Sequence, residues 1–183
     1  GLNGFVIGFA GRLSEEKNVE LLLRATAGLN FEYTLLIDNY FEGNYRQRLD
    51  AVAKELGVNK NIVYFDANFA EIADYINCMD VLVLPSKTTP RWMEQFGRVL
   101  IEAMACEIPV IGSNSGSIPW VIGDAGLIFD ERSKKELAQK IDLIHSDKKL
   151  RKQLVEKGVK RVEGNFLNNI LAKEFFDFFM QME

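Results

Sequence analysis

Residues 92–113, which read WMEQFGRVLIEAMACEIPVIGS, carry the clearest indication of the fold. Just before them, residues 81–86 (VLVLPS) are apolar on both faces and end at a proline and a serine, which is typical of a buried parallel strand. A polar loop and the apolar helix expected over residues 97–106 follow. Ligands of open α/β sheets bind outside the carboxyl ends of the strands. The loop that holds Glu94 and the helix that holds Glu102 are therefore predicted to lie at a binding site.

The same alternation of strand and helix extends outward over the whole chain. Expected strands occupy residues 5–11, 33–38, 61–65, 81–86, 108–113 and 126–130, with helical patterns between them and three more helices after the last strand. Such alternation favours a parallel sheet with right-handed crossovers. The predicted fold class is α/β, a doubly wound parallel sheet of about six strands with helices on both faces, as in Rossmann-like domains. Asn18 is expected to cap the first helix.

Composition narrows the class of protein. The chain has 183 residues, which suits one domain with a full core, and its net charge of −4 gives no electrostatic footprint for nucleic acid. No apolar run approaches the roughly 20 residues that span a bilayer, and no signal peptide is visible. Cys78 and Cys106 are interpreted as buried thiols of a reducing compartment. The expected location is cytoplasmic, and with one histidine and no cysteine pair, no metal site is expected.

Several features converge on an anion. The loop after the first strand holds Gly11, Arg12 and Lys17, and a helix follows it. Helix N-termini and arginine or lysine side chains bind phosphate. Glu94 and Glu102 beside such a site are suited to accept hydrogen bonds from hydroxyl groups, because carboxylates and phosphates repel each other. A ligand with a phosphate centre and polyol ends, such as a nucleotide sugar, fits this arrangement.

Simpler interpretations stand beside these. Arg12 and Lys17 can equally be solvated loop charges. Glu102, however, lies in the apolar run LIEAMA, where a buried carboxylate needs a partner. Trp92 and Arg98 suit packing as well as they suit ligand contacts, and residues 113–116 can be a simple turn.

Four segments carry a resemblance to a known family. They read GRLSEEKN (11–18), ADYINCMDVLVLPS (73–86), EQFGRVLIEAMACEIPVIGS (94–113) and VIGDAGLIF (121–129). In this order they resemble the C-terminal half of family-four retaining glycosyltransferases of the GT-B fold, over nearly the whole chain. In that family the C-terminal domain binds the nucleotide-sugar donor and a separate N-terminal domain supplies the acceptor site. The resemblance implies that residues 1–183 are the donor-binding domain and that the N-terminal acceptor domain is absent from this chain.

The resemblance also assigns roles by position. Arg12, Lys17 and Glu94 are the implied catalytic residues: the two cations hold the diphosphate and stabilise the leaving nucleotide, and the carboxylate contacts the transferred sugar. The implied nucleotide-sugar-binding residues are Gly11, Arg12, Lys17, Asn68, Phe69, Glu94, Phe96, Gly97, Val99, Leu100 and Glu102. Among them, Phe96 and Gly97 offer their backbone to the sugar, amides near Val99 and Leu100 face phosphate, Glu102 accepts from the ribose, and Asn68 and Phe69 lie near the base.

The implied activity is metal-independent hexosyl transfer from a nucleotide sugar, with retention, to an acceptor such as a growing polysaccharide. The donor is a substrate, no cofactor is implied, and the isolated domain is expected to be inactive. Membrane contact, if any, is expected to be peripheral, at the inner membrane face, and to involve the longer protein. Two alternatives stay open from the sequence: a nucleotide-sugar epimerase half-domain and a non-catalytic nucleotide-binding module.

The chain departs from the family pattern at four places. Residues 37–43 (IDNYFEG) replace a glycine-rich turn, Ala67 and Glu107 stand where glycine is usual, and Trp120 stands where an acidic residue is common. The C-terminal helix, expected from Leu167 to Met182, is rich in phenylalanine. We expect its wide apolar face to clamp it across the sheet, with packing against another domain as the alternative.

Overall fold

The structure is a computed structural model that describes residues 2–41, 43–68 and 70–180, with the backbone alone for residues 174 and 175. The strands are β1 (Phe5–Phe9), β2 (Tyr33–Asp38), β3 (Ile62–Phe65), β4 (Val81–Leu84), β5 (Val110–Ser113) and β6 (Leu127–Phe129). The helices are α1 (Val19–Thr26), α2 (Tyr45–Glu55), η1 (Asn59–Asn61, a 3-10 turn), α3 (Ile72–Ile76), α4 (Arg98–Ala105), α5 (Ile118–Ile122), α6 (Lys134–Ser146), α7 (Lys148–Asn165) and α8 (Asn168–Met180).

The strands form one parallel sheet in the order β3-β2-β1-β4-β5-β6. Phe5 pairs with Tyr33 and Leu82 with Val110. Every residue of β1, β2, β4 and β5 is buried, as expected of strands that helices cover on both faces. The predicted α/β fold with a parallel sheet is confirmed.

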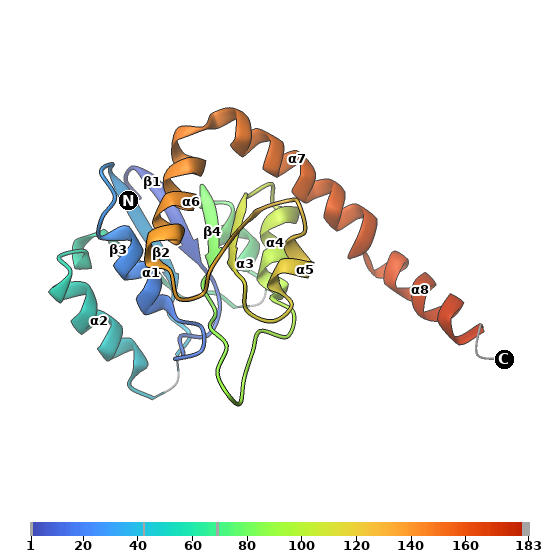
Figure 1. Cartoon of the computed structure of the whole chain (residues 1–183), viewed down its shortest axis with the longest axis horizontal. Helices are drawn as coiled ribbons and strands as arrows, with labels where there is room; N and C mark the ends of the chain where they lie inside the picture. Colours follow the sequence, from blue (N-terminus) through green and yellow to red (C-terminus); the bar gives the residue numbers. More distant parts are fainter. Residues whose placement is uncertain (1, 42, 69, 181–183) are drawn as a thin grey trace.

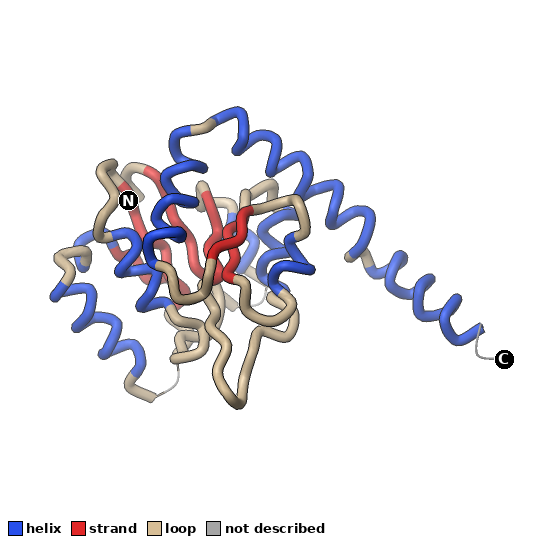
Figure 2. The backbone as a smooth tube through the Cα atoms, in the orientation of Figure 1, coloured by secondary structure: helices blue, strands red, loops and turns tan. Residues whose placement is uncertain are grey.

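Two layers of helices enclose the sheet (Figure 1). In one layer α1 packs against α2 and α6, and in the other α4 packs against α3, α5 and α7. Right-handed crossovers place the helices before β3 and those after it on opposite faces. The order of the strands reverses between β1 and β4, and the loops that follow these two strands lie at the same edge of the sheet (Figure 2). Such a switch point is where doubly wound sheets bind ligands.

Two local expectations are wrong. Asn18 precedes α1 but its side chain makes no capping hydrogen bond, because its backbone is left-handed (φ 54°) and its amide donates to the Glu131 carbonyl instead. Cys78 is exposed, and Cys106 is only partly buried, at the edge of the core against which it packs.

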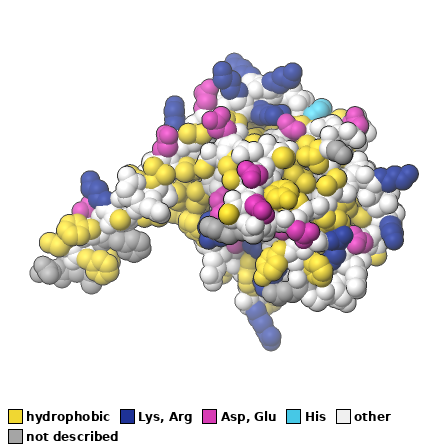
Figure 3. Space-filling model, turned by 180° about the vertical axis from the view of Figure 1, so that it is seen from behind, with side chains coloured by type: hydrophobic (Ala, Val, Ile, Leu, Met, Phe, Trp, Pro, Cys, Tyr) yellow, Lys and Arg dark blue, Asp and Glu magenta, His cyan; other side chains and the backbone are white. Residues whose placement is uncertain are grey.

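The C-terminal helix also differs from its expectation. Instead of lying across the sheet, α8 projects away from the body beyond the end of α7 (Figures 1 and 3). Phe176, Phe178, Phe179 and Met180 are each more than half exposed. Burying such side chains contributes about 1.5–3 kcal/mol each, so this helix presents an apolar surface that nothing in the described chain covers.

The turn after α4 explains why glycine suits position 107. The N–H of Glu107 donates to the Met104 carbonyl and that of Ile108 to the Ala103 carbonyl, which is the Schellman pattern. This motif places Glu107 in the left-handed region, at φ 60°.

Glu107→Gly should therefore raise the free energy of unfolding by about 0.5–1 kcal/mol. A non-glycine residue in the left-handed region costs about 1–2 kcal/mol, and part of this gain is offset because glycine loses more conformational entropy on folding. Glu107→Ala, which keeps a Cβ, should give no such gain. Urea unfolding of the two variants measures the difference, and equal stabilities would contradict this account.

Candidate functional site

A cavity of about 470 Å³ opens at the carboxyl edge of the sheet. Its walls come from the loops after β1, β2, β3 and β4 and from the start of α4. The lining residues are Ala10, Gly11, Arg12, Lys17, Asp38, Tyr40, Ala67, Asn68, Ile72, Glu94, Gly97, Arg98, Val99 and Glu102. Eight of the predicted site residues are among them: Gly11, Arg12, Lys17, Asn68, Glu94, Gly97, Val99 and Glu102.

The other three predicted residues do not line this cavity. Leu100 is fully buried in the core. Phe96 is 39% exposed and its ring packs near those of Trp120 and Phe166. Phe69 lies outside the described residues. The prediction for Phe96 and Leu100 concerned their backbone, and the backbone of both lies beside Gly97 and Val99 at the start of α4.

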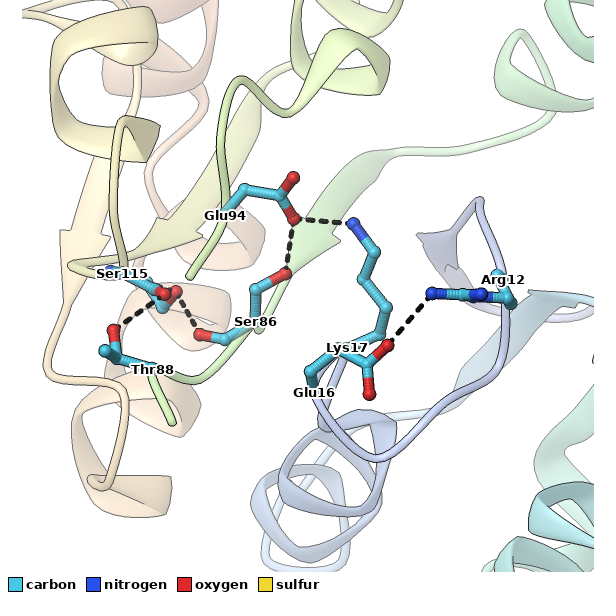
Figure 4. A network of polar contacts seen from close by, with 8 residues as sticks. Arg12, Glu16, Lys17, Ser86, Thr88, Glu94 and Ser115 are labelled. Carbon is cyan, nitrogen blue, oxygen red and sulfur yellow. Dashed lines mark hydrogen bonds and ion pairs between the residues drawn. The ribbon is translucent and has the colours of Figure 1, made fainter. Parts of the chain in front are cut away.

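An ion pair between two predicted residues forms one wall. The Lys17 ammonium lies 2.5 Å from Glu94 Oε2, and the Ser86 hydroxyl donates to the same oxygen at 2.8 Å (Figure 4). Glu94 is 6% exposed. A carboxylate this buried is costly without charge compensation and hydrogen bonds, and Lys17 and Ser86 provide both.

The loop after β5 fixes the position of the Glu94 loop through hydrogen bonds. The Ser117 N–H donates to the Glu94 carbonyl at 3.0 Å, and the buried Ser113 hydroxyl donates to the Ser86 carbonyl at 2.5 Å. Ser115 Oγ lies 3.0 Å from Thr88 Oγ1. Gly116 has φ 53°, and a Cβ there would lie 2.0 Å from the Glu94 carbonyl oxygen. Residues 113–117 therefore do more than form a turn, because their contacts fix the position of the loop that holds the Glu94 carboxylate.

Gly116→Ala should displace the Glu94 loop and lower the free energy of unfolding by about 1–3 kcal/mol, through a left-handed conformation and a steric clash. Gly28→Ala is the matched control, since its Cβ would meet nothing within 4 Å, and it should be neutral or stabilising by up to about 1 kcal/mol. Denaturant unfolding compares the two. Equal effects would show that the close approach of Gly116 does not matter.

Arg12 has a carboxylate partner of its own. Its guanidinium lies 3.0 Å from Glu16 Oε1. Burial alone would raise the pKa of Glu16, but hydrogen bonds and the charges of Arg12 and Lys17 together lower it. Glu16 is thus held as an anion beside both cations, and Arg12 and Lys17 each contact a carboxylate.

Glu102 corrects one argument from the sequence. Its side chain is 28% exposed and pairs with Arg98 at 3.0 Å, so it is not a buried carboxylate among apolar neighbours. It faces the cavity because the apolar residues around it in α4, Leu100, Ala103 and Met104, turn toward the core. The buried carboxylate of this segment is Glu94.

The start of α4 adds backbone donors. Gly97 precedes the helix with φ 78°, and both Gly97 and Val99 line the cavity. The first N–H groups of a helix have no intrahelical partner and carry partial positive charge. Across the cavity, the Asn68 amide oxygen accepts from the N–H groups of Ala70 and Glu71, so Asn68 orders the turn before α3.

Sequence reasoning missed Asp38. This buried carboxylate at the end of β2 lines the cavity and accepts from the N–H groups of Gly11 and Tyr40, both at 3.1 Å. Burial raises its pKa, and the charge of Asp66 raises it further, although the hydrogen bonds from Tyr40 and Gly11 lower it. The departure from a glycine-rich turn at residues 37–43 was the available signal.

The raised pKa of Asp38 gives a pH dependence with a defined sign. Folding favours the protonated form, so the contribution of Asp38 to stability is complete below its ordinary pKa of 3.8 and is lost as the pH rises through the raised value. Asp38→Asn should remove this decline, seen as a stability difference between variant and wild type that changes as the pH rises from below 3.8 through the raised pKa of Asp38. A difference that stays constant as the pH rises above 3.8 would contradict the assignment.

Within residues 2–41, 43–68 and 70–180, no group of three or more His, Cys, Asp or Glu side chains could hold a metal ion. No helix in this part of the chain is long and apolar enough to cross a membrane.

Comparisons with known proteins identify relatives. The sequence profile of the family described as "Glycosyl transferases group 1" matches residues 2–161. The chain is 32% identical over 179 residues to the capsular polysaccharide biosynthesis glycosyltransferase CapM of Staphylococcus aureus, which covers 94% of this chain and 45% of CapM. The chain therefore spans about half the length of the curated relatives it matches.

Solved structures agree on the fold. The C-terminal domain of the glycosyl transferase group 1 family protein LpcC from Francisella tularensis superposes with a TM-score of 0.77 at 25% identity, covering 90% of this chain and 87% of that one. Anabaena HepE, solved in complex with UDP, superposes with a TM-score of 0.89 at 21% identity over 98% of this chain and 49% of its own. The second likeness concerns the fold alone.

Proposed function

This chain belongs to the glycosyl transferases group 1 family, and from that premise we propose that it is the donor-binding half of a retaining glycosyltransferase. It binds a nucleotide sugar in the cavity at the carboxyl edge, and a second, N-terminal half supplies the acceptor, such as a growing polysaccharide. The match to a capsular polysaccharide glycosyltransferase over about half its length supports this division.

The observation that carries the proposal is the Lys17–Glu94 pair inside the cavity. The diphosphate binds Lys17 and Arg12 in place of Glu94 and Glu16, and it accepts hydrogen bonds from N–H groups at the start of α4. Glu94, freed from the cation, accepts from hydroxyls of the transferred sugar, and Glu102 accepts from the ribose. Glu94 thus exchanges its internal cation, Lys17, for hydroxyl donors of the ligand.

The same arrangement gives a mechanism. The acceptor hydroxyl forms its bond to the anomeric carbon as the bond from that carbon to phosphate breaks, and its proton passes to the departing phosphate. During the step negative charge grows on the leaving nucleotide, beside Lys17, Arg12 and the α4 N-terminus. Groups aimed at developing charge in this way lower barriers by about 2.7–4 kcal/mol each. Side-chain cations then perform the electrostatic role that a metal ion has in other transferases, so we propose metal-independent transfer.

The apolar surface of α8 supports the proposal that the protein has a second half. Phe176, Phe178, Phe179 and Met180 are exposed on a helix that leaves the body, and exposed apolar patches mark docking surfaces. We infer that α8 packs against the N-terminal half, and that the isolated chain binds donor but transfers little. The cytoplasmic location and a peripheral contact with the inner membrane face remain predictions.

The test uses the longer protein with labelled UDP-, GDP- and ADP-sugars, with and without a glycan extract of its source cells as acceptor. We expect label to enter the glycan with the anomeric configuration of the donor, read from the anomeric proton coupling, and with undiminished rate in EDTA. Isomerised free sugar without acceptor would support the epimerase instead. Binding without any turnover would support a non-catalytic module.

A further inference from the structure

The connection between β4 and α4 is long and contains a short hairpin at Thr89–Trp92, close to Lys17. It runs from residue 85 to residue 97, whereas βα loops usually have about 2–6 residues. The Thr89 N–H donates to the Trp92 carbonyl at 2.7 Å, and the Trp92 N–H donates to the Thr89 carbonyl at 3.4 Å. Pro90 lies in the turn between them, where its fixed φ restricts the backbone.

The base of this hairpin is held by the loop after β1 and by residues that follow β5 and β6. The Lys87 N–H donates to the Glu16 carbonyl at 2.8 Å. Thr88 contacts Ser115 through its hydroxyl at 3.0 Å and donates its N–H to Glu131 at 2.7 Å. The hairpin therefore has a defined position relative to the loop that holds Lys17.

Trp92 uses this position to face Lys17. The Lys17 ammonium lies 5.4 Å from the centre of the Trp92 ring, within the distance at which an aromatic face attracts a cation. The same ammonium lies 2.5 Å from Glu94. Its two partners differ in kind: the carboxylate neutralises its charge, and the ring attracts the charge without neutralising it.

This difference matters when a diphosphate competes for Lys17. A lysine has a flexible stem, and without the ring its most favourable partner is the buried Glu94. The ring stabilises the ammonium at the cavity wall even after it leaves the carboxylate. We propose that Trp92 is a positioning residue of the donor site, which holds Lys17 where it can pass from Glu94 to the diphosphate.

This inference rests on the proposed function. It predicts that Trp92→Leu weakens the binding of the preferred nucleoside diphosphate by about 5-fold to 30-fold, the upper range of cation–π attraction. Trp92→Phe keeps an aromatic face and should stay within about threefold of wild type. Met93→Ala is the control on the same hairpin, because Met93 is 56% exposed, and it should bind as wild type does.

The experiment is calorimetric titration of wild type and the three variants with UDP, GDP and ADP, beside thermal unfolding of each. Retained binding in Trp92→Phe distinguishes the attraction between ring and ammonium from a general loss of packing. Both Trp92→Leu and Trp92→Phe lose the indole, but only Trp92→Phe keeps an aromatic ring. If wild type binds and Trp92→Leu binds equally well, or if Trp92→Phe loses as much affinity as Trp92→Leu, this inference alone is overturned. Absence of binding by the wild-type chain and by the longer protein overturns the proposed function with it.

Discussion

Lys17→Met should lower the free energy of unfolding by about 3–5 kcal/mol and abolish measurable binding of nucleoside diphosphates. The Glu94 side chain is 8% exposed and that of Lys17 19%. Removing the cation leaves a buried carboxylate with only the Ser86 hydroxyl as a side-chain partner in the described structure, and breaking a buried pair on one side carries a cost of this size. Urea unfolding and calorimetry measure the two effects.

A double variant separates the two effects. Lys17→Met combined with Glu94→Gln removes both charges, so stability should return to within about 1 kcal/mol of wild type while diphosphate binding stays lost. Lys87→Met is the matched control, because Lys87 pairs with Glu15, whose side chain is 65% exposed, and such pairs contribute about 0–1 kcal/mol. A double variant that binds diphosphate would remove Lys17 from the site.

Glu94→Gln should lower the rate of sugar transfer by the longer protein by about 10²- to 10³-fold. The amide keeps the shape of the side chain but loses the charged acceptor proposed for the sugar hydroxyls. Affinity for a nucleoside diphosphate without sugar should stay the same or rise, because the carboxylate competes with phosphate for Lys17. Kinetics with donor and acceptor, beside titration with the diphosphate, measure the two quantities.

Lys17→Met should lose diphosphate binding, whereas Glu94→Gln should keep it and lose sugar transfer. This difference distinguishes the roles of the two side chains. Glu15→Gln, at an exposed carboxylate paired with Lys87, is the control and should change neither quantity by more than about twofold. Transfer that survives Glu94→Gln would favour a non-catalytic role for the chain. Diphosphate binding lost in Glu94→Gln would mean that the carboxylate organises the phosphate site rather than the sugar site.

The sequence predicts the sheet well because buried parallel strands leave continuous apolar runs. Residues 33–38 are expected as a strand and form β2 with the same limits. The Glu94 segment is also correctly expected between β4 and α4. These features depend on neighbours in the chain, so a local pattern contains them.

Contacts between distant residues explain what the sequence could not predict. Lys17 and Glu94 are 77 residues apart, and Gly116 reaches the Glu94 carbonyl only because β4 and β5 are adjacent. Burial of Glu102 was predicted from its apolar neighbours, but on a helix those neighbours can point to the core while the carboxylate does not. For α8, the apolar pattern shows that a face needs covering and not what covers it.

The central claim is that Arg12 and Lys17 form a diphosphate site in this cavity. The measurement that tests it most directly is calorimetric titration of the chain and of the longer protein with UDP, GDP and ADP and their sugar conjugates. The double variant Arg12→Ala/Lys17→Ala is titrated in the same way. We predict selective binding of one nucleotide, lost in the double variant. Binding that survives in the double variant, or no binding of any nucleotide by either protein, would contradict the claim.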